Sequence, residues 1–248
     1  MAALELRSPA ELTRKGRKLA RLLREPAFRR PLRHGVAATV EHERVPFAGY
    51  RTVIDVGAGR GQFAVFALRA FPAAQIVGFE PLPSSFTTAT RVLGGSSRVE
   101  LRRQAIGAEP GTATIHVTAD ADSSSLRRPT GEQTQRFPGT GGIDRVEVDV
   151  TSLDDAVVET RRPALLKLDL QGGELDALRG AERLLESIDD VFAECSFVEL
   201  YEGQALADQV IHHLRDRGFA LRGVYSPTYG EDGVCVQADL LFGRSAPA

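Results

Sequence analysis

Residues able to hold a nucleotide gather after one short apolar run. The stretch VIDVGAGRGQFA, residues 53–64, has the β-branched residues of a buried strand followed by Gly57, Gly59 and Gly61. Glycines let the backbone approach a ligand closely, and a helix that begins near Gly61 offers free N–H groups to an anionic or electron-rich group. Glu80 follows the next apolar run, 19 residues after Gly61, where an acid in this architecture binds the ribose hydroxyls of an adenosine. The pattern predicts an adenosine site.

The glycine spacing and Asp55 separate two cofactors that contain adenosine. A dinucleotide fingerprint is G-x-G-x-x-G, whereas the spacing here, G-x-G-x-G, brings the third glycine one residue too early for a pyrophosphate turn. Asp55, just ahead of the loop, would repel a pyrophosphate but can help to hold the cationic methionine portion of S-adenosylmethionine, directly or through water. The sequence favours S-adenosylmethionine, and glycines with a purely structural role are the alternative.

Catalytic groups are predicted in a second stretch, LLKLDLQGGE, residues 165–174. Its leucines indicate a buried strand, so Lys167 and Asp169 are polar residues at the carboxyl end of that strand, with Gln171 and Glu174 close behind. A hydroxyl must lose its proton as it attacks a methyl group, which calls for a positioned base or a metal. Asp169 is the first candidate for the base, and a helix cap near Gly172 is its alternative role.

Glu194 ends the next predicted strand and should face the same edge of the sheet. Asp169, Glu174 and Glu194 could therefore form an oxygen-only site suited to Mg²⁺, although the sequence leaves the metal unknown. A hydrogen-bond acceptor that orders this edge or binds substrate is the alternative for Glu194. His34 and His42, near the start of the domain, could reach an acceptor pocket, and Tyr201 could line it.

The elements that position these residues alternate along the chain. Strands are expected at 52–56, 75–79, 98–103, 113–118, 145–150, 164–169, 190–196, 219–225 and 234–242, with helices in most of the longer gaps. Such alternation predicts a doubly wound, mostly parallel sheet with its ligand at the carboxyl ends of the strands. The polar residues 119–142 interrupt this rhythm and are expected to form a lid over the substrate.

Composition narrows the function classes. The 248 residues carry a net charge of −2, which shows no overall attraction to nucleic acid, and no run of apolar residues is long enough for a membrane span or a signal peptide. We therefore expect a cytoplasmic location, no nucleic-acid partner and no stable membrane insertion. Two cysteines, Cys195 and Cys235, are too few for a disulfide scaffold and are expected to be reduced thiols.

The basic residues are concentrated at the start of the chain. Residues 1–45 hold 11 Lys and Arg against 5 Asp and Glu, a net charge of +6, whereas the remainder holds 20 against 28, a net charge of −8. Ser8 begins a capping box with Pro9 and Glu11, and Leu12, Gly16, Leu19, Ala20 and Leu23 follow at helical spacing. We expect this leucine face to pack on the domain, with an anionic membrane surface or an acidic partner as alternatives.

Four segments in order resemble the FkbM family of S-adenosylmethionine-dependent methyltransferases: VIDVGAGRGQFA, GFEPLPSSF, LLKLDLQGGELDALRGAERLL and VFAECSFVELYEGQAL. The resemblance covers about residues 50–225. It implies a class I methyltransferase (Rossmann-like) fold with seven main strands, the last antiparallel, and methyl transfer most often to a hydroxyl of a sugar, glycan or polyketide-type natural product. Gly173 departs from the family, which commonly carries a larger residue there.

Together these observations predict an N-terminal helical extension over residues 1–49 and a methyltransferase domain over residues 50–248. The expected S-adenosylmethionine site comprises Asp55, Gly57, Ala58, Gly59, Gly61, Glu80, Pro81, Ala105 and Asp169. The expected catalytic residues are Asp169, Glu194 and Glu174, and the partner is a small-molecule or glycan hydroxyl acceptor, with a homo-oligomer also compatible. A nicotinamide-dependent oxidoreductase and a non-catalytic binding protein that retains the fold are the alternative functions.

Overall fold

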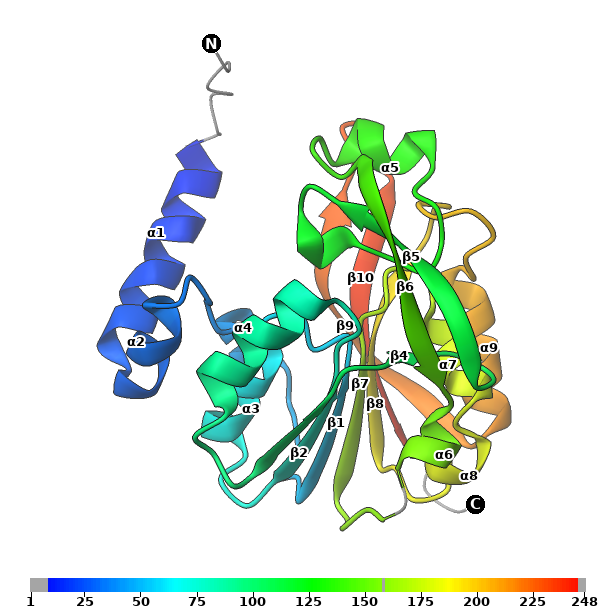
Figure 1. The fold of residues 1–248 in the computed structure, drawn as a ribbon. Coiled ribbons are helices and arrows are strands. Elements are labelled where there is room, and N and C mark those ends of the chain that lie inside the picture. Colours follow the sequence, from blue (N-terminus) through cyan, green and yellow to red (C-terminus); the bar gives the residue numbers. More distant parts are fainter. Residues whose placement is uncertain (1–8, 158, 245–248) are drawn as a thin grey trace.

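A seven-stranded sheet forms the centre of the computed structural model, which describes residues 9–157 and 159–244 (Figure 1). In spatial order its strands are β3 (Val99–Arg102), β2 (Gln75–Phe79), β1 (Thr52–Val56), β7 (Ala164–Leu168), β8 (Asp190–Ser196), β10 (Cys235–Arg244) and β9 (Phe219–Tyr229). Pairing is parallel from β3 to β8, and β10 runs antiparallel to both of its neighbours. The predicted class I methyltransferase sheet, with its last strand antiparallel, is confirmed.

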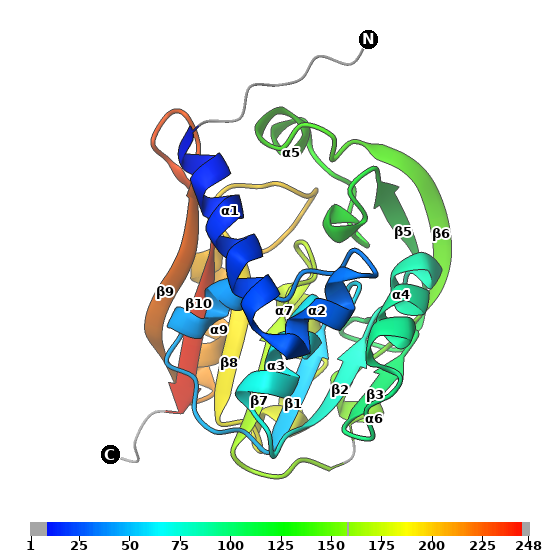
Figure 2. The ribbon, with the colours of Figure 1, turned by 90° about the vertical axis from the view of Figure 1, so that its left-hand side faces the viewer.

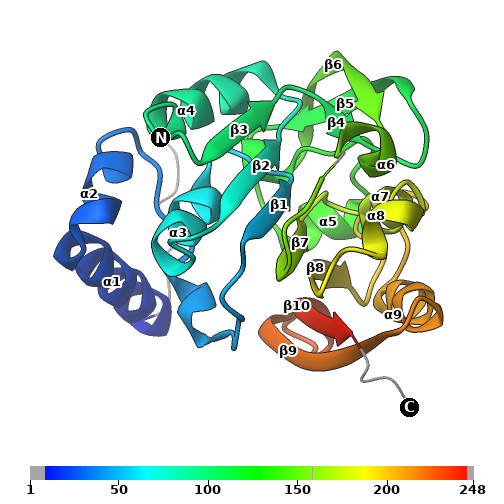
Figure 3. The same ribbon diagram turned by 90° about the horizontal axis from the view of Figure 1, so that it is seen from below.

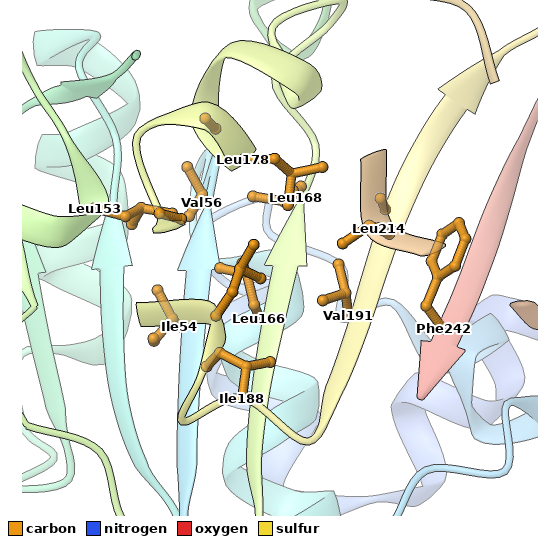
Figure 4. Close-up of a cluster of buried hydrophobic side chains, with 14 of the residues drawn as sticks. Ile54, Val56, Leu153, Leu166, Leu168, Leu178, Ile188, Val191, Leu214 and Phe242 are labelled. Carbon is orange, nitrogen blue, oxygen red and sulfur yellow. The ribbon is translucent and has the colours of Figure 1, made fainter. Parts of the chain in front are cut away.

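The central strands β1 and β7 are buried along their whole length because helices cover both faces of the sheet. Successive side chains of a strand point to opposite faces, so Ile54 and Val56 enter one apolar core and Val53 enters the other. Figure 4 shows the first core, where Leu166, Leu168, Val191 and Phe242 meet side chains from the helices. This packing fixes the carboxyl ends of β1 and β7 side by side.

Helices form a layer on each side of the sheet (Figure 3). The first layer contains α1 (Pro9–Arg24), α2 (Pro26–Leu32), α3 (Gln62–Ala70) and α4 (Pro83–Leu93), and the second contains α6 (Leu153–Ala156), α7 (Glu174–Arg179), α8 (Glu182–Leu185) and α9 (Ala207–Asp216). A short 3-10 helix, η1 (Val40–Arg44), links the N-terminal helices to the sheet. The result is the three-layer arrangement that a doubly wound sheet requires.

A second, three-stranded sheet stands beyond the carboxyl edge of the first (Figures 1 and 2). It consists of β4 (Ala105–Ile106), β6 (Gly142–Thr151) and β5 (Gly111–Thr118), with β5 and β6 antiparallel. The strands predicted at 113–118 and 145–150 therefore form, but outside the main sheet. Between them lie η2 (Ala121–Ser123) and α5 (Gly131–Arg136), so the predicted lid contains two short helices.

The N-terminal helix α1 docks on the domain by a different side from the one predicted. Leu22 is 2% exposed, whereas Leu19 and Leu23 are 51% and 52% exposed, so the prediction that these two leucines pack is wrong. Ion pairs from Lys18 to Glu41 and from Arg21 to Glu43, at 2.8 Å each, join the basic side of α1 to η1. The predicted cap at Ser8 lies outside the described residues.

Two further expectations concern the sulfur chemistry and the membrane. Cys195 and Cys235 are free thiols, as predicted. Across the part of the chain that the structure describes, no helix combines the length and the apolar character needed to cross a bilayer.

Candidate active site

The loop from β1 to α3 adopts backbone conformations that favour glycine at three positions. Gly57, Gly59 and Gly61 have φ of +76°, +55° and +94°, a region that side chains disfavour. A Cβ at Gly57 would also collide with the carbonyl oxygen of Asp169, and one at Gly61 would come within 2.8 Å of Leu93. The loop thus packs against the end of β7 on one side and against α4 on the other, and α3 begins at Gln62.

Glu80 is fixed at the end of β2 by the backbone of two loops. Its Oε2 accepts a hydrogen bond from the N–H of Gly59 at 2.8 Å, and its Oε1 accepts one from the N–H of Leu82 at 2.8 Å. The side chain is buried, and burial raises the pKa of Glu80 to about 7 despite these two donors. A carboxyl at this edge, tied to the glycine loop, is placed to accept hydrogen bonds from ligand hydroxyls.

Lys167 joins the glycine loop to the two aspartates at the ends of β1 and β7. Its Nζ donates a hydrogen bond to the carbonyl of Gly57 at 3.0 Å and lies 3.1 Å from Oδ1 of Asp55 and 3.6 Å from Oδ2 of Asp169. Burial lowers the pKa of Lys167, but Asp55 and Asp169 outweigh it and raise the pKa above its ordinary value. The ammonium therefore stays charged between the carboxylates.

Asp55 itself lies beneath the loop and does not reach solvent. It is 0% exposed, and burial raises its pKa against the opposing effect of Lys167. The structure places Lys167, rather than Asp55, in the wall of the adjoining cavity. The sequence marked Lys167 as a polar residue in an apolar strand but gave it no role, and the contact of Asp55 with the cofactor, directly or through water, stays a prediction.

Gln171 connects Asp169 to Glu194. The sequence alone did not indicate a specific role for it. Its Nε2 donates to Oδ1 of Asp169 and to Oε2 of Glu194, both at 2.8 Å, and its Oε1 lies 2.9 Å from the hydroxyl of Tyr201. Gln171 adopts φ of +53°, an unusual conformation for a residue with a side chain, which the surrounding contacts maintain. Burial, followed by the charge of Asp169, raises the pKa of Glu194 well above its ordinary value.

Glu174 faces the backbone of its own turn, and the catalytic role expected of it stays a prediction. Its Oε1 accepts hydrogen bonds from the N–H of Leu170 at 2.8 Å and of Gly172 at 3.3 Å, which braces the turn between β7 and α7. The side chain is buried, and burial raises its pKa to about 7. It does not line the cavity. A carboxylate shortly after a strand can serve as a base or as a brace for the turn, and the direction of its side chain separates the two roles.

The three carboxylates considered for Mg²⁺ do not converge on a common point. The amide of Gln171 lies between Asp169 and Glu194, and Glu174 is turned to the backbone of its own turn. Within residues 9–157 and 159–244, no group of three or more His, Cys, Asp or Glu side chains has a geometry that could hold a metal ion. The carboxylates therefore give no support to the magnesium site considered from the sequence.

A cavity of about 410 Å³ opens at the carboxyl ends of β1, β2 and β7. Seven of the nine residues expected to bind the cofactor line it: Gly57, Ala58, Gly59, Glu80, Pro81, Ala105 and Asp169. Asp55 and Gly61 lie behind its wall. The volume falls in the range of sites for small organic ligands, and the bare backbone of the loop, with Glu80 beside it, matches the needs of an adenosine. The residues present therefore fit S-adenosylmethionine.

Two segments outside the main sheet complete the wall. The lid contributes Asp122, whose Oδ2 accepts hydrogen bonds from Arg60 at 3.1 Å and Gln62 at 3.0 Å across the glycine loop, as well as Ser124 and Ser125. The N-terminal extension contributes residues between 35 and 42, including Thr39 and His42. The first part of the predicted lid, within residues 121–126, thus lines the cavity, and its role over a substrate stays a prediction.

Of the other residues considered, His42 reaches the cavity and His34 does not. His42 is 8% exposed, with its ring between Phe63, Phe66 and Phe192 and its Nε2 3.7 Å from Oδ2 of Asp239. His34 is exposed and is not part of the cavity wall. Tyr201 is buried behind Gln171, and its hydroxyl lies 2.9 Å from the carbonyl of Ser123, so it supports the lid.

Comparison with known proteins identifies the family. Residues 55–221 match the family model described as the methyltransferase FkbM domain. The chain belongs to the FkbM methyltransferase family. Methyltransferase 1 of Beauveria bassiana is 29% identical over 174 residues, which cover 62% of this chain and 68% of that protein. The 2-O-methyltransferase NoeI of Sinorhizobium fredii is 30% identical over 165 residues, which cover 61% of this chain and 66% of NoeI, just under two thirds of its length.

Solved structures are more distant from this FkbM family member. A ribosomal protein L11 methylase from Lactobacillus delbrueckii subsp. bulgaricus superposes with a TM-score of 0.46 at 14% identity, over 84% of this chain and 76% of that one. Membership in the family implies methyltransferase activity with S-adenosylmethionine as the methyl donor, and it argues against the nicotinamide-dependent alternative.

Proposed function

We propose that this protein transfers the methyl group of S-adenosylmethionine to a hydroxyl of a sugar, glycan or polyketide-type natural product. One observation carries the proposal: Asp169 stands in the same cavity wall as the glycine loop and Glu80, and it is the one of the three predicted catalytic carboxylates that reaches this cavity. The printed name of NoeI, a 2-O-methyltransferase, supports an oxygen acceptor.

The cofactor would lie along the loop that follows β1. Gly57, Ala58 and Gly59 would offer backbone contacts, and Glu80 would accept hydrogen bonds from the ribose hydroxyls, with Pro81 and Ala105 beside the base. Asp55 would act indirectly by holding Lys167, whose Nζ lies 3.1 Å from its Oδ1 and whose side chain lines the cavity. When bound, S-adenosylmethionine supplies a methyl group activated by its positive sulfur.

Asp169 is the proposed base for the acceptor hydroxyl. Gln171 holds its Oδ1, and Lys167 lies 3.6 Å from its Oδ2, so the carboxylate is fixed in direction, while its side chain remains 39% exposed. Oδ2 would take the proton of the hydroxyl as the oxygen attacks the methyl carbon. Glu194 touches Asp169 only through Gln171 and is a positioning residue in this scheme. A positioned base contributes about 10²- to 10⁴-fold to such a reaction.

The acceptor would enter between the lid and residues 35–42 of the N-terminal extension. Residues 35–42 precede residues 55–221, the part of the chain that matches the family. This side of the cavity therefore suits a role in acceptor choice. Thr39 Oγ1 and His42 Nδ1 are buried atoms that have no hydrogen-bond partner among the described residues. Buried polar atoms are normally satisfied, and a polar, hydroxyl-bearing acceptor or an ordered water could satisfy both.

A transfer assay with isotopically labelled S-adenosylmethionine tests the proposal. The acceptor panel contains a monosaccharide glycoside, an oligosaccharide, a macrolide alcohol, a phenol and an amine, and nuclear magnetic resonance locates the new methyl group. The expected product is a methyl ether of an aliphatic hydroxyl. Methylation of nitrogen or carbon, or of the phenol alone, would contradict the proposed acceptor class while leaving methyl transfer itself intact.

A further inference from the structure

The helix α1 carries an apolar stripe on the side that faces away from the domain. Gly16, Leu19, Ala20 and Leu23 are all exposed, and their spacing of three, one and three residues places them along one face of the helix. The opposite side contacts the domain through the buried Leu22 and through the pairs from Lys18 to Glu41 and from Arg21 to Glu43. These contacts fix the rotation of α1, so the stripe remains directed outward.

Exposed arginines follow this stripe along the chain. Arg24 follows it on α1, and Arg29, Arg30 and Arg33 lie on or just after α2, all of them exposed. Glu25, the acid between the two helices, is paired with Arg69 at 3.5 Å. Residues 1–45 hold 11 basic against 5 acidic side chains, and the rest of the chain holds 20 against 28. The positive charge is therefore concentrated on the same part of the molecule as the stripe.

Two kinds of occupant would suit an apolar stripe with positive flanks: an anionic lipid surface and an acidic face of a second copy of the chain. A stable interface between proteins buries roughly 800 Å² on each partner, with about 20 residues a side. The stripe consists of four described residues, two of them glycine and alanine, and is much smaller. A helix lying in a lipid interface needs only a narrow apolar side and cations at the level of the headgroups.

We propose that α1 lies on an anionic lipid surface, with Leu19 and Leu23 at the boundary between headgroups and acyl chains and the arginines of α1 and α2 against the headgroups. Figures 1 and 3 show both helices at the periphery of the molecule, where a flat surface can reach them. The binding is peripheral and reversible. The proposal stands independently of the proposed acceptor.

Vesicle flotation with the full chain tests this assignment. The probes are vesicles of phosphatidylcholine alone and of phosphatidylcholine mixed with phosphatidylglycerol. The parent protein should float with the mixed vesicles and not with the neutral ones, and added salt should weaken binding because it screens the arginines. Leu19→Glu with Leu23→Glu should lower the partition coefficient about tenfold or more, because both side chains would bring charge into the lipid boundary.

A matched control makes the same chemical change elsewhere. Ile143→Glu with Tyr229→Glu replaces two residues that are 68% and 62% exposed on β6 and β9. This variant should float as the parent does, and all proteins should keep the parent's melting temperature because the changed residues are exposed. Equal flotation of the α1 variant and the parent would overturn the proposal, as would a parent that ignores anionic vesicles. A parent dimer that the α1 changes dissociate would also overturn it, since a second copy would then cover the stripe.

Discussion

At the carboxyl end of β7, alternating polar side chains form one connected group. Lys167 contacts Asp55 and the loop carbonyl of Gly57, and Asp169 contacts Lys167 and Gln171. Each group limits the freedom of the next, which is how a catalytic carboxylate is held in position. Asp169 lines the cavity, and its side chain is 39% exposed, whereas that of Lys167 is 7% exposed.

Replacing Asp169 by asparagine tests its role as the base. Asp169→Asn keeps the shape and the hydrogen bond with Gln171, so affinity for S-adenosylhomocysteine should stay near that of the parent. Turnover on an identified acceptor should fall by about 10²- to 10⁴-fold, the usual contribution of one proton-transfer group. Asp208→Asn, an exposed position on α9, is the control and should keep parent activity. Full turnover in Asp169→Asn would leave this residue as a positioning group only.

Replacing two glycines of the loop by alanine should lower stability to different extents. At Gly59 an added Cβ would come within 3.0 Å of Oε1 of Gln62, the end of a flexible side chain, whereas at Gly57 it would meet the backbone of Asp169. Gly59→Ala should therefore cost about 1–2 kcal/mol of unfolding free energy, from its left-handed backbone alone. Gly57→Ala should cost clearly more, and both should weaken binding of S-adenosylhomocysteine.

Urea denaturation and calorimetry measure these two effects. Gly111→Ala is the control, because its Cβ would meet nothing within 4 Å and its backbone needs no positive φ. A Gly57→Ala protein as stable as Gly59→Ala would contradict the close approach of the loop to β7.

Among the elements, the lid is joined to the loop after β8 and to α7 by the side chain of Arg127. Arg127 donates to the carbonyls of Glu202 and Gly203 and to Oδ2 of Asp176, at 3.2, 2.7 and 2.6 Å. Each bond is worth about 1 kcal/mol, so Arg127→Met should open the lid more often and raise the rate of proteolysis within 119–141 by about tenfold or more. Mass spectrometry of the fragments locates the cut. Arg145→Gln, exposed on β6, should be cut at the parent rate, and a lid equally resistant in both would show that other contacts hold it.

The sequence predicted the main strands well because burial on both faces demands continuous apolar runs. The strands at 52–56 and 75–79 agree with the structure to the residue. It did not predict that β5 and β6 leave the main sheet, because strand partners are chosen by contacts far along the chain. Contacts far along the chain also decide how α1 docks. Its leucines lie on more than one side, and hydrogen bonds to Glu41 and Glu43, more than 20 residues away, select the side that faces the domain.

The candidate site was predictable where backbone geometry dictates residue type. Glycines with positive φ and an acid at the end of β2 leave a clear pattern, and the structure brings both to the cavity. The roles of Lys167, Gln171 and Glu174 depend on the direction of each side chain, which spacing alone does not define. Glu174 shows the difference, since it has the same chemistry as Asp169 but faces the backbone of its own turn.

For the whole molecule, buried acids predict a stability that falls as the pH rises. Burial raises the pKa of Glu80 and Glu174 to about 7 and also raises the pKa of Asp55 and Glu194. The folded protein thus keeps protons that the unfolded chain has already lost, so this contribution to stability is complete below the ordinary carboxyl pKa and is lost as the pH passes through about 7. The free energy of unfolding should be roughly 1–3 kcal/mol lower at about pH 8 than at about pH 5.5.

Chemical denaturation at several pH values measures this slope. Glu174→Gln removes one of the buried acids and keeps an oxygen for the turn, so its stability should depend less steeply on pH than that of the parent. Stability that is constant or rises across this interval would contradict the assigned burial of these carboxyls.

The central claim is that the loop after β1 and Glu80 form a site for S-adenosylmethionine, and calorimetric titration of the parent protein with S-adenosylhomocysteine, beside NADH, tests it most directly. We expect S-adenosylhomocysteine to bind with one site per chain and NADH to give no saturable heat. Glu80→Ala, with an unchanged melting curve, should lose most of that affinity, because it removes the acceptor for the ribose hydroxyls. Saturable binding of NADH in place of S-adenosylhomocysteine, or an undiminished affinity in Glu80→Ala, would contradict the assignment.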